Sequence, residues 1–241
     1  MKVQLKLSHF FFTAPKDNYT KLCHKLLNHH DLKEKDLIFL FNELFNDSLD
    51  SFKKAIALEA LRLKRESLEE NISCFDVLWE KTEHETLDIP LTISLSDPYD
   101  GFNRHRYLNL FLAPLLASLG VPTYLHGIDE VSPKRGVNSF KILTAAGKNP
   151  CLELGTVKKN LLTPDIGWGY CDQSVYAPEL AKLKALRQAM VKRPVLATIE
   201  KLLLPFKSKK ETMLVTGYTH PPYKEMLSQI LIKTNKQSSF L

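Results

Sequence analysis

Glycine is missing from the first hundred residues of this chain, and this limits what the first part can fold into. All nine glycines lie at or after Gly101. Glycine is the usual residue where the backbone takes a positive φ or approaches another segment closely. We therefore expect the first part to be helical, and the later part to contain the tight turns between strands and helices.

Apolar residues in the first part recur at helical spacing. Four helices are expected, at about residues 17–29, 34–46, 49–65 and 67–84. Asp47 or Ser48 can cap the third helix, and Ser67 with Glu70 predicts a capping box at the start of the fourth. The pattern predicts a small helical bundle over residues 1–87, with plain core packing for most apolar faces and a possible dimer interface for others.

Strands alternate with helices in the rest of the chain. Strands are expected at residues 89–95, 121–125, 166–170 and 212–217, and helices at 107–119, 137–146, 178–190, 194–204 and 223–233. This alternation is typical of a parallel sheet with right-handed crossovers. We predict an α/β fold, with a mostly parallel sheet flanked by helices over residues 88–241. The segment Ser238–Leu241 predicts the start of one more strand, so we expect this domain to be incomplete at the C-terminus.

Charge divides at the same boundary. Residues 1–88 contain 13 Lys+Arg against 16 Asp+Glu, and residues 89–241 contain 20 against 11, so the net +6 combines −3 with +9. A basic body attracts phosphates, anionic metabolites and nucleic acids alike. The four cysteines lack CxxC spacing, so we expect reduced, buried thiols and no zinc site. With no apolar run of about 18 residues and no leader, we expect a cytoplasmic protein without a membrane partner.

The loop after the second expected strand is the first candidate site. Val121–Gly127 reads as a short buried strand, and Ile128–Gly136 as a polar loop that leads into a helix. In open α/β sheets, ligands bind at the carboxyl ends of strands, where helix N-termini offer N–H groups to anions. The candidate anion ligands are His126, Ser132, Lys134 and Gly136. An ordinary strand-to-helix loop is the alternative.

Two motifs carry a family resemblance. The segment Leu58–Glu70 resembles a helix junction written LxALRxKGET. Leu125–Gly127 and Val131–Gly136 resemble, without a gap, a loop that contains the motifs KHGN and VSS. Both motifs are those of the anthranilate phosphoribosyltransferases, members of glycosyltransferase family 3. The resemblance implies a nucleoside phosphorylase/phosphoribosyltransferase-like fold and a cleft for a phosphorylated pentose or another anionic small molecule. It also implies Mg²⁺ as a cofactor, with its acidic ligands beyond Leu241, so no metal ligand is assigned within the chain.

The chain departs from the family at positions that bear on catalysis. The family's phosphate-binding loop GTGGD is replaced by Ser96–Gly101, whose proline and tyrosine would block a close backbone approach. Leu125 and Ile128 replace a lysine and an asparagine, which removes one cation and one amide from the pocket. The implied activity is that of a phosphoribosyltransferase or related glycosyltransferase, and no catalytic residue is assigned.

A subgroup of the family fits more of the chain. Tyr99–Gly101 and Thr216–Tyr223 resemble segments of paralogues described as nucleic-acid-binding homodimers that lack the biosynthetic activity. A histidine of those paralogues is Ala197 here. This resemblance implies DNA or RNA as the partner and a homodimer formed through the helical part.

Two sets of candidate residues follow. The substrate-binding set is Tyr99, Gly101, Asn109, His126, Gly127, Ser132, Lys134, Gly136 and Arg193. The nucleic-acid-binding set is Arg104, Arg106, Lys134, Arg135 and Lys192. Each has a structural alternative: His126 can anchor its own loop, His220 can stabilise a turn, and the cations can be solvated charges or members of surface ion pairs. Asp129 and Glu130 are read as exposed caps, with metal binding as the alternative.

Overall fold

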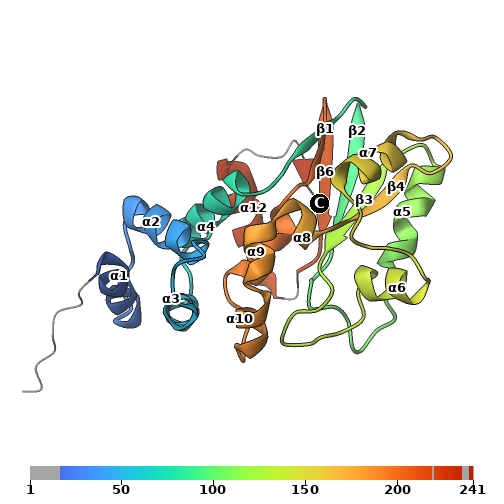
Figure 1. Cartoon of the computed structure of the whole chain (residues 1–241). Coiled ribbons are helices and arrows are strands. Elements are labelled where there is room, and N and C mark those ends of the chain that lie inside the picture. Colours follow the sequence, from blue (N-terminus) through green and yellow to red (C-terminus); the bar gives the residue numbers. More distant parts are fainter. Residues whose placement is uncertain (1–16, 219, 235–238, 241) are drawn as a thin grey trace, which may run out of the picture.

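The first part of the chain is a bundle of helices. The computed structural model describes residues 17–218, 220–234 and 239–240. The bundle contains α1 (Asn18–Leu27), α2 (Glu34–Leu44), α3 (Ser51–Lys64) and α4 (Leu68–Glu80), at the left of Figure 1. Their buried faces are apolar, with Leu26, Phe41, Leu58 and Phe75 almost fully buried. The helical spacing of the sequence therefore predicted these elements, although α4 ends four residues early.

Side-chain caps fix where these helices begin. Ser67 and Glu70 form the predicted capping box at the start of α4. The predicted cap of α3 is wrong, because Asp50 accepts from the N–H groups of Phe52 and Lys53 at 3.0 and 3.4 Å. Ser48 is instead part of the preceding turn, where its N–H donates to Oδ1 of Asn46.

The second part is built on a parallel sheet with the order β4-β3-β2-β6-β7. Its strands are β2 (Leu91–Ser96), β3 (Thr123–Gly127), β4 (Trp168–Asp172), β6 (Glu211–Thr216) and β7 (Ser239–Phe240). All four neighbouring pairs are parallel, so the carboxyl ends of the strands lie at one edge, the lower one in Figure 1. The predicted α/β fold with a parallel sheet is confirmed.

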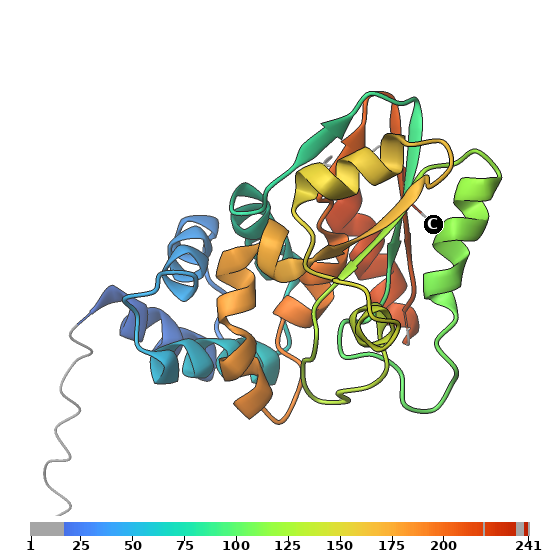
Figure 2. The same cartoon turned by 45° about the vertical axis from the view of Figure 1, so that its right-hand side comes forward.

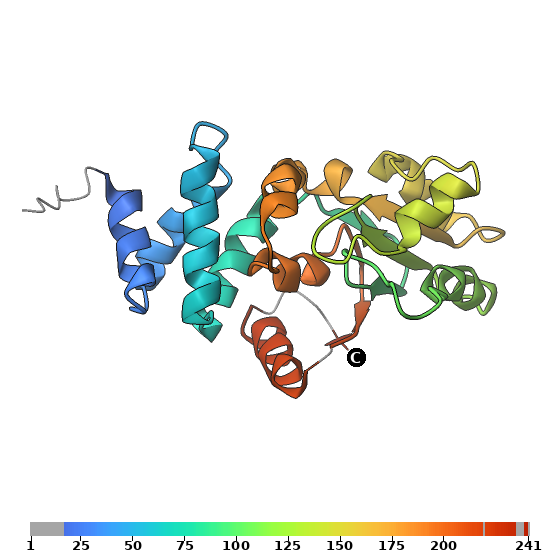
Figure 3. The same cartoon turned by 90° about the horizontal axis from the view of Figure 1, so that it is seen from below.

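Helices cover both faces of this sheet. On one face lie α5 (Asn109–Ser118) and α6 (Ser139–Ala145), whose Leu110, Ala113 and Phe140 pack against Leu125 and Tyr170. On the other face lie α7 (Leu154–Leu162) and α12 (Pro221–Thr234). The core on this second face is continuous with the core of the helical part. Figure 3 shows α1 and α3 at the opposite end of the molecule from α5.

Several short elements differ from the prediction. The expected helix 178–190 is two pieces, α9 (Pro178–Lys182) and α10 (Lys184–Ala189), and a further short helix, α8 (Gln173–Tyr176), precedes them. The backbone of Ala177, with φ −141° and ψ 63°, separates α8 from α9. The expected helix 194–204 is α11 (Leu196–Ile199) followed by a short 3₁₀ turn.

Four of the described elements were not predicted. They are α7, α8 and the two strands β1 (Glu85–Leu87) and β5 (Phe206–Ser208), and these two strands pair with each other in parallel. Cys23, Cys74 and Cys171 are buried as expected, but Cys151 is exposed. Among the described residues, no helix has both the length and the apolar composition that a membrane crossing needs.

Candidate functional site

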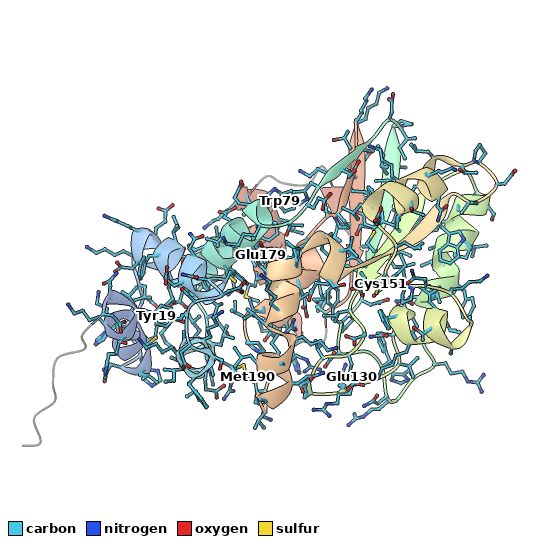
Figure 4. All side chains as sticks on the ribbon, viewed as in Figure 1. Tyr19, Trp79, Glu130, Cys151, Glu179 and Met190 are labelled. Atoms are coloured by element: carbon cyan, nitrogen blue, oxygen red, sulfur yellow. The ribbon has the colours of Figure 1, made fainter. Side chains whose placement is uncertain are left out.

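The candidate residues gather at the carboxyl edge of the sheet. The loop 97–108 follows β2 and the loop 128–138 follows β3, so both begin at this edge. Figure 2 shows the loop 128–138 next to α10. Met190 and Glu130 are labelled at this edge in Figure 4. The sequence prediction placed the site at this position, because parallel strands bring the loops that follow them to the same edge.

His126 lies inside the protein rather than in an open cleft. Its side chain is buried at the end of β3, where Nδ1 hydrogen-bonds with the hydroxyl of Tyr99 and lies 3.3 Å from the hydroxyl of Tyr176. The two tyrosine hydroxyls are 2.5 Å apart. Burial lowers the pKa of His126 from its usual 6.5 to about 3, so the imidazole is neutral at physiological pH.

Little space remains beside His126. The cavity lined by His126, Tyr99, Tyr107 and Tyr170 has a volume of about 10 Å³, which is about the room of one water molecule. Gly127 permits the approach of Tyr170, because a Cβ added at Gly127 would lie 3.1 Å from the tyrosine hydroxyl. Pockets for ligands of drug size usually have volumes of roughly 300 Å³ or more. The cavity therefore has no room for a phosphorylated pentose.

Asp97 fixes the loop that follows β2. Its carboxylate accepts hydrogen bonds from the hydroxyl of Tyr107 at 2.6 Å and from the amide of Asn109 at 2.5 Å. Burial raises the pKa of Asp97, and the two hydrogen bonds act in the opposite direction. Asn109, a predicted substrate-binding residue, is therefore a partner of Asp97 at the start of α5.

Gly101 and Gly136 bring the two loops into backbone contact. The N–H of Gly136 donates to the carbonyl of Asp100 at 2.8 Å, and Phe102 pairs with Val137 as an antiparallel bridge. Gly101 has a φ of +74°, and an added Cβ there would lie 2.7 Å from the carbonyl carbon of Gly136. Both positions therefore require glycine for packing, apart from any ligand.

Asn138 holds the second loop from inside and was not found from the sequence. Its amide donates to the carbonyls of Ile128 and Asp129 at 2.9 and 3.2 Å, and its Oδ1 accepts from the N–H of Lys141 at the start of α6. An asparagine just before a helix is a common cap. That signal was present in the sequence, but it did not reveal the contacts with the loop.

Asp100 joins two of the predicted cationic residues. Oδ2 of Asp100 accepts from Nε of Arg193 at 3.0 Å and also from its Nη2, while Oδ1 lies 3.6 Å from Nζ of Lys134. The carboxylate is only 4% exposed, whereas the side chains of Arg193 and Lys134 are 46% and 39% exposed. The structure therefore brings Lys134 and Arg193 together, and the group between them is a carboxylate of the chain itself.

A second ion pair lies deeper and was also missed from the sequence. Arg187 donates from both terminal nitrogens to the two carboxylate oxygens of Glu200, at 2.6 and 2.8 Å, and both side chains are 2% exposed. Gln173 donates to the same carboxylate at 3.3 Å, and the main-chain oxygen of Glu200 accepts from Tyr99. This bidentate pair therefore holds Glu200 in place, and the main chain of Glu200 in turn positions Tyr99 beside His126.

The remaining cations lie on the outside of the two loops and at the end of α10. The amide of Asn103 donates to the carbonyl of Lys134 at 2.9 Å, so the exposed segment that follows it runs beside the second loop. We call the following exposed cations the basic rim: Arg104, Arg106, Lys134, Arg135, Lys192 and Arg193.

Other candidates have partners within the protein. The hydroxyl of Ser132 donates to the carbonyl of Gln188 at 3.2 Å. Asp129 pairs with Lys184, and Glu130 pairs with Lys141 at 2.9 Å, so both acidic residues belong to ion pairs rather than to helix caps. Within the part of the chain that the structure describes, no group of three His, Cys, Asp or Glu side chains could hold a metal ion. The candidate residues therefore mostly have partners within the chain, and the cavity beside His126 does not fit a ribosyl diphosphate.

Comparison of sequences finds relatives over most of the chain. No family model matches. A protein of Aquifex aeolicus described only as uncharacterized is 28% identical over 218 residues, which are 88% of this chain and 62% of that protein. An anthranilate phosphoribosyltransferase of Pasteurella multocida is 26% identical over 214 residues, which are 87% of this chain and 62% of that enzyme. The chain thus spans about three fifths of the length of these relatives.

Comparison of structures also finds anthranilate phosphoribosyltransferases. An anthranilate phosphoribosyltransferase of Thermus thermophilus superposes with a TM-score of 0.70 at 19% identity, over 88% of this chain and 63% of that one. The Saccharomyces cerevisiae enzyme in complex with PRPP and Mg superposes with a TM-score of 0.71 at 13% identity, over 93% of this chain and 65% of that one. The chain therefore has the fold of the anthranilate phosphoribosyltransferases and resembles them in sequence over most of its length.

Proposed function

We propose that this protein binds the phosphates of DNA or RNA through the basic rim and has no phosphoribosyltransferase activity. The observation that carries the proposal is the contrast between the interior and the exterior of the site. The cavity beside His126 holds about 10 Å³, while the cations Arg104, Arg106, Arg135 and Lys192 are exposed outside it. Exposed cations favour a large polyanion over a small ligand that must be enclosed.

The distribution of charge supports a polyanion as the partner. The excess of nine positive charges lies in residues 89–241, and six of the cations gather at one edge of the sheet. Contacts from lysine and arginine to phosphates supply affinity that does not depend on base sequence. The paralogues that the sequence resembles are described as nucleic-acid-binding, which agrees with this use of the rim.

Exposed aromatic rings beside the rim suit unpaired bases. Tyr218 and Tyr223 are 51% and 43% exposed, and they follow β6 at the same carboxyl edge. Nζ of Lys201 donates to the carbonyl of Gly217 at 3.0 Å, which fixes this segment next to the site. Bases of single strands stack on such rings with little sequence preference. We therefore expect the rim to bind single strands as well as duplexes, with unpaired bases placed toward Tyr218.

Neutralising the outer cations tests the function. We expect the fourfold variant Arg104→Gln, Arg106→Gln, Arg135→Gln and Lys192→Gln to bind a labelled DNA duplex at least about tenfold more weakly. The slope of log K against log salt should fall by about 0.9 for each phosphate that the variant no longer neutralises. Fluorescence anisotropy between about 50 and about 200 mM salt measures both quantities.

A control set of equal charge separates the rim from net charge. Lys21, Lys25, Lys33 and Lys35 are exposed in the helical part, and their replacement by glutamine removes the same four charges. This control should retain nearly all of the wild-type affinity. Equal losses in the two variants, or no binding by the wild type, would refute the rim as the binding surface.

We also propose that a second copy of the chain covers the outer face of α3. Phe52, Ile56 and Leu63 are 78%, 47% and 54% exposed and lie on one side of this helix. Leu27 of the neighbouring α1 is 48% exposed and extends the apolar surface. Such exposed apolar surfaces usually mark interfaces. The family resemblance, which implies a homodimer formed through the helical part, selects a second copy as the occupant.

Sedimentation tests the dimer. We expect the wild type to sediment as a dimer at tens of micromolar, and the variant Phe52→Glu, Ile56→Lys to sediment as a monomer, because the two charges disrupt the apolar face without changing net charge. The control variant Leu162→Glu with Ile166→Lys changes two exposed apolar positions, one at the end of α7 and one in the turn that follows it, and it should remain dimeric. A monomeric wild type at these concentrations would rule the dimer out.

A further inference from the structure

The carboxylate of Asp100 lies where two cations of the rim converge. Arg193 directs both Nε and Nη2 at Oδ2, and Lys134 approaches Oδ1 at 3.6 Å. The two cations come from segments far apart in the sequence, and both remain partly open to solvent. Asp100 itself is almost fully buried beneath them. One face of each cation is therefore occupied by a fixed negative charge of the chain.

The geometry around Asp100 is that of a bound anion. Carboxylates and phosphates accept the same charge-assisted hydrogen bonds from arginine and lysine. Nζ of Lys134 also donates to the carbonyl of Gly101 at 3.2 Å and lies 5.6 Å from the centre of the Phe102 ring, so this cation is positioned by several contacts. A phosphate oxygen placed between Lys134 and Arg193 would meet the same donors. The carboxylate excludes such an oxygen by its negative charge.

We propose that Asp100 is a built-in counter-ion, which takes the place of a phosphate between Lys134 and Arg193 and keeps a small polyphosphate out. The chain supplies its own anion at this position, so a diphosphate does not find the two cations free. What this inference implies for nucleic-acid binding rests on the proposed function. Because Asp100 pairs with Lys134 and Arg193, the other four cations of the basic rim would contact the phosphates of the nucleic acid.

Titration with inorganic pyrophosphate tests the counter-ion directly. The variant Asp100→Asn keeps the shape of the side chain and removes its charge. By isothermal titration calorimetry, we expect the wild type to show no saturable binding at millimolar pyrophosphate. Asp100→Asn should bind at least about tenfold more tightly, as expected when one like charge at close range is removed. Adding Arg193→Gln to this variant should abolish the gain.

A matched control separates the position from net charge. Asp88 is exposed and pairs with Lys209 at 2.7 Å at the opposite edge of the sheet, and Asp88→Asn changes net charge by the same amount. This control should behave like the wild type. Equal gains in Asp100→Asn and Asp88→Asn would overturn the proposal. So would a folded Asp100→Asn that binds no better than the wild type, or a wild type that already binds pyrophosphate tightly.

Separate measurements of folding and of DNA binding complete the test. Circular dichroism reports whether Asp100→Asn and a second neutral variant, Asp100→Ser, are folded. Failure of both to fold would overturn the proposal, because the carboxylate would then be a structural requirement. With duplex DNA, Asp100→Asn should steepen the salt slope by about 1 to 2. If Asp100→Asn gains pyrophosphate binding but the protein does not bind DNA, the counter-ion is supported and the proposed function is refuted. If the protein binds DNA but Asp100→Asn does not gain pyrophosphate binding, the proposed function is supported and the counter-ion is refuted.

Discussion

Replacing Arg187 by methionine is expected to lower the free energy of unfolding by about 3 to 5 kcal/mol. Arg187 is 2% exposed and donates two hydrogen bonds to Glu200. Its removal leaves the carboxylate of Glu200 buried beside the amide of Gln173 without a cation. Desolvation of an unpaired charge is the reason for the size of the loss. Denaturant unfolding of the wild type and the variant measures it.

A double variant provides the control for this prediction. Arg187→Met with Glu200→Leu removes both charges, and we expect it to regain most of the lost stability, because apolar residues of similar volume can replace a buried pair. Tyr99 should remain in place, since it contacts the main-chain oxygen of Glu200 rather than the carboxylate. If the double variant proves as unstable as Arg187→Met, the loss comes from packing and not from the unpaired charge.

Acid is expected to destabilise the fold through His126. Burial lowers the pKa of His126 to about 3, against 6.5 for an exposed histidine. Between these two values the unfolded chain binds a proton that the folded chain does not, so stability is complete above pH 6.5 and falls as the pH decreases. The loss is about 1.4 kcal/mol for each pH unit in this window. Unfolding midpoints in denaturant at pH 7, 5 and 4 measure it.

The variant His126→Gln isolates this contribution. Glutamine does not titrate, so its stability should fall less than that of the wild type between pH 6.5 and pH 4, by roughly 3 kcal/mol. Carboxylates and the other histidines are common to both proteins and cancel in the comparison. His105→Gln, at an exposed loop position, should keep the wild-type response. Parallel stability curves for the wild type and His126→Gln would contradict a neutral buried imidazole.

The sequence predicted the elements whose pattern is local and long. The four helices of the first part follow from apolar spacing, and the capping box of Ser67 and Glu70 is a short-range signal. The strands β1 and β5 have three residues each and pair across the fold, so no periodic pattern can identify them. Helix α7 was detectable, because Leu154, Val157 and Leu161 are buried at helical spacing.

The position of the candidate loops could be predicted from the sequence, but the contacts between them could not. The strand pattern predicted that Ile128–Gly136 follows a strand, and the structure has this loop at the carboxyl edge of the sheet beside Ser96–Gly101. The partners inside the site come from distant segments: 93 positions separate Asp100 from Arg193, and 77 separate Tyr99 from Tyr176. Sequence spacing says nothing about such contacts. Whether the two sets of candidate residues bind a substrate or nucleic acid stays a prediction, and the experiments above decide it.

The contact between Gly101 and Gly136 packs the backbones of the two loops tightly against each other. A Cβ added at Gly101 would lie 2.7 Å from the carbonyl carbon of Gly136, so the two loops are expected to move together. Tyr99 lies two residues before Gly101, and its hydroxyl contacts the imidazole of His126. We therefore expect a partner that binds the outer arginines to displace Tyr99 as well. Ultraviolet difference absorption of the buried phenols would then register an event that takes place entirely on the surface.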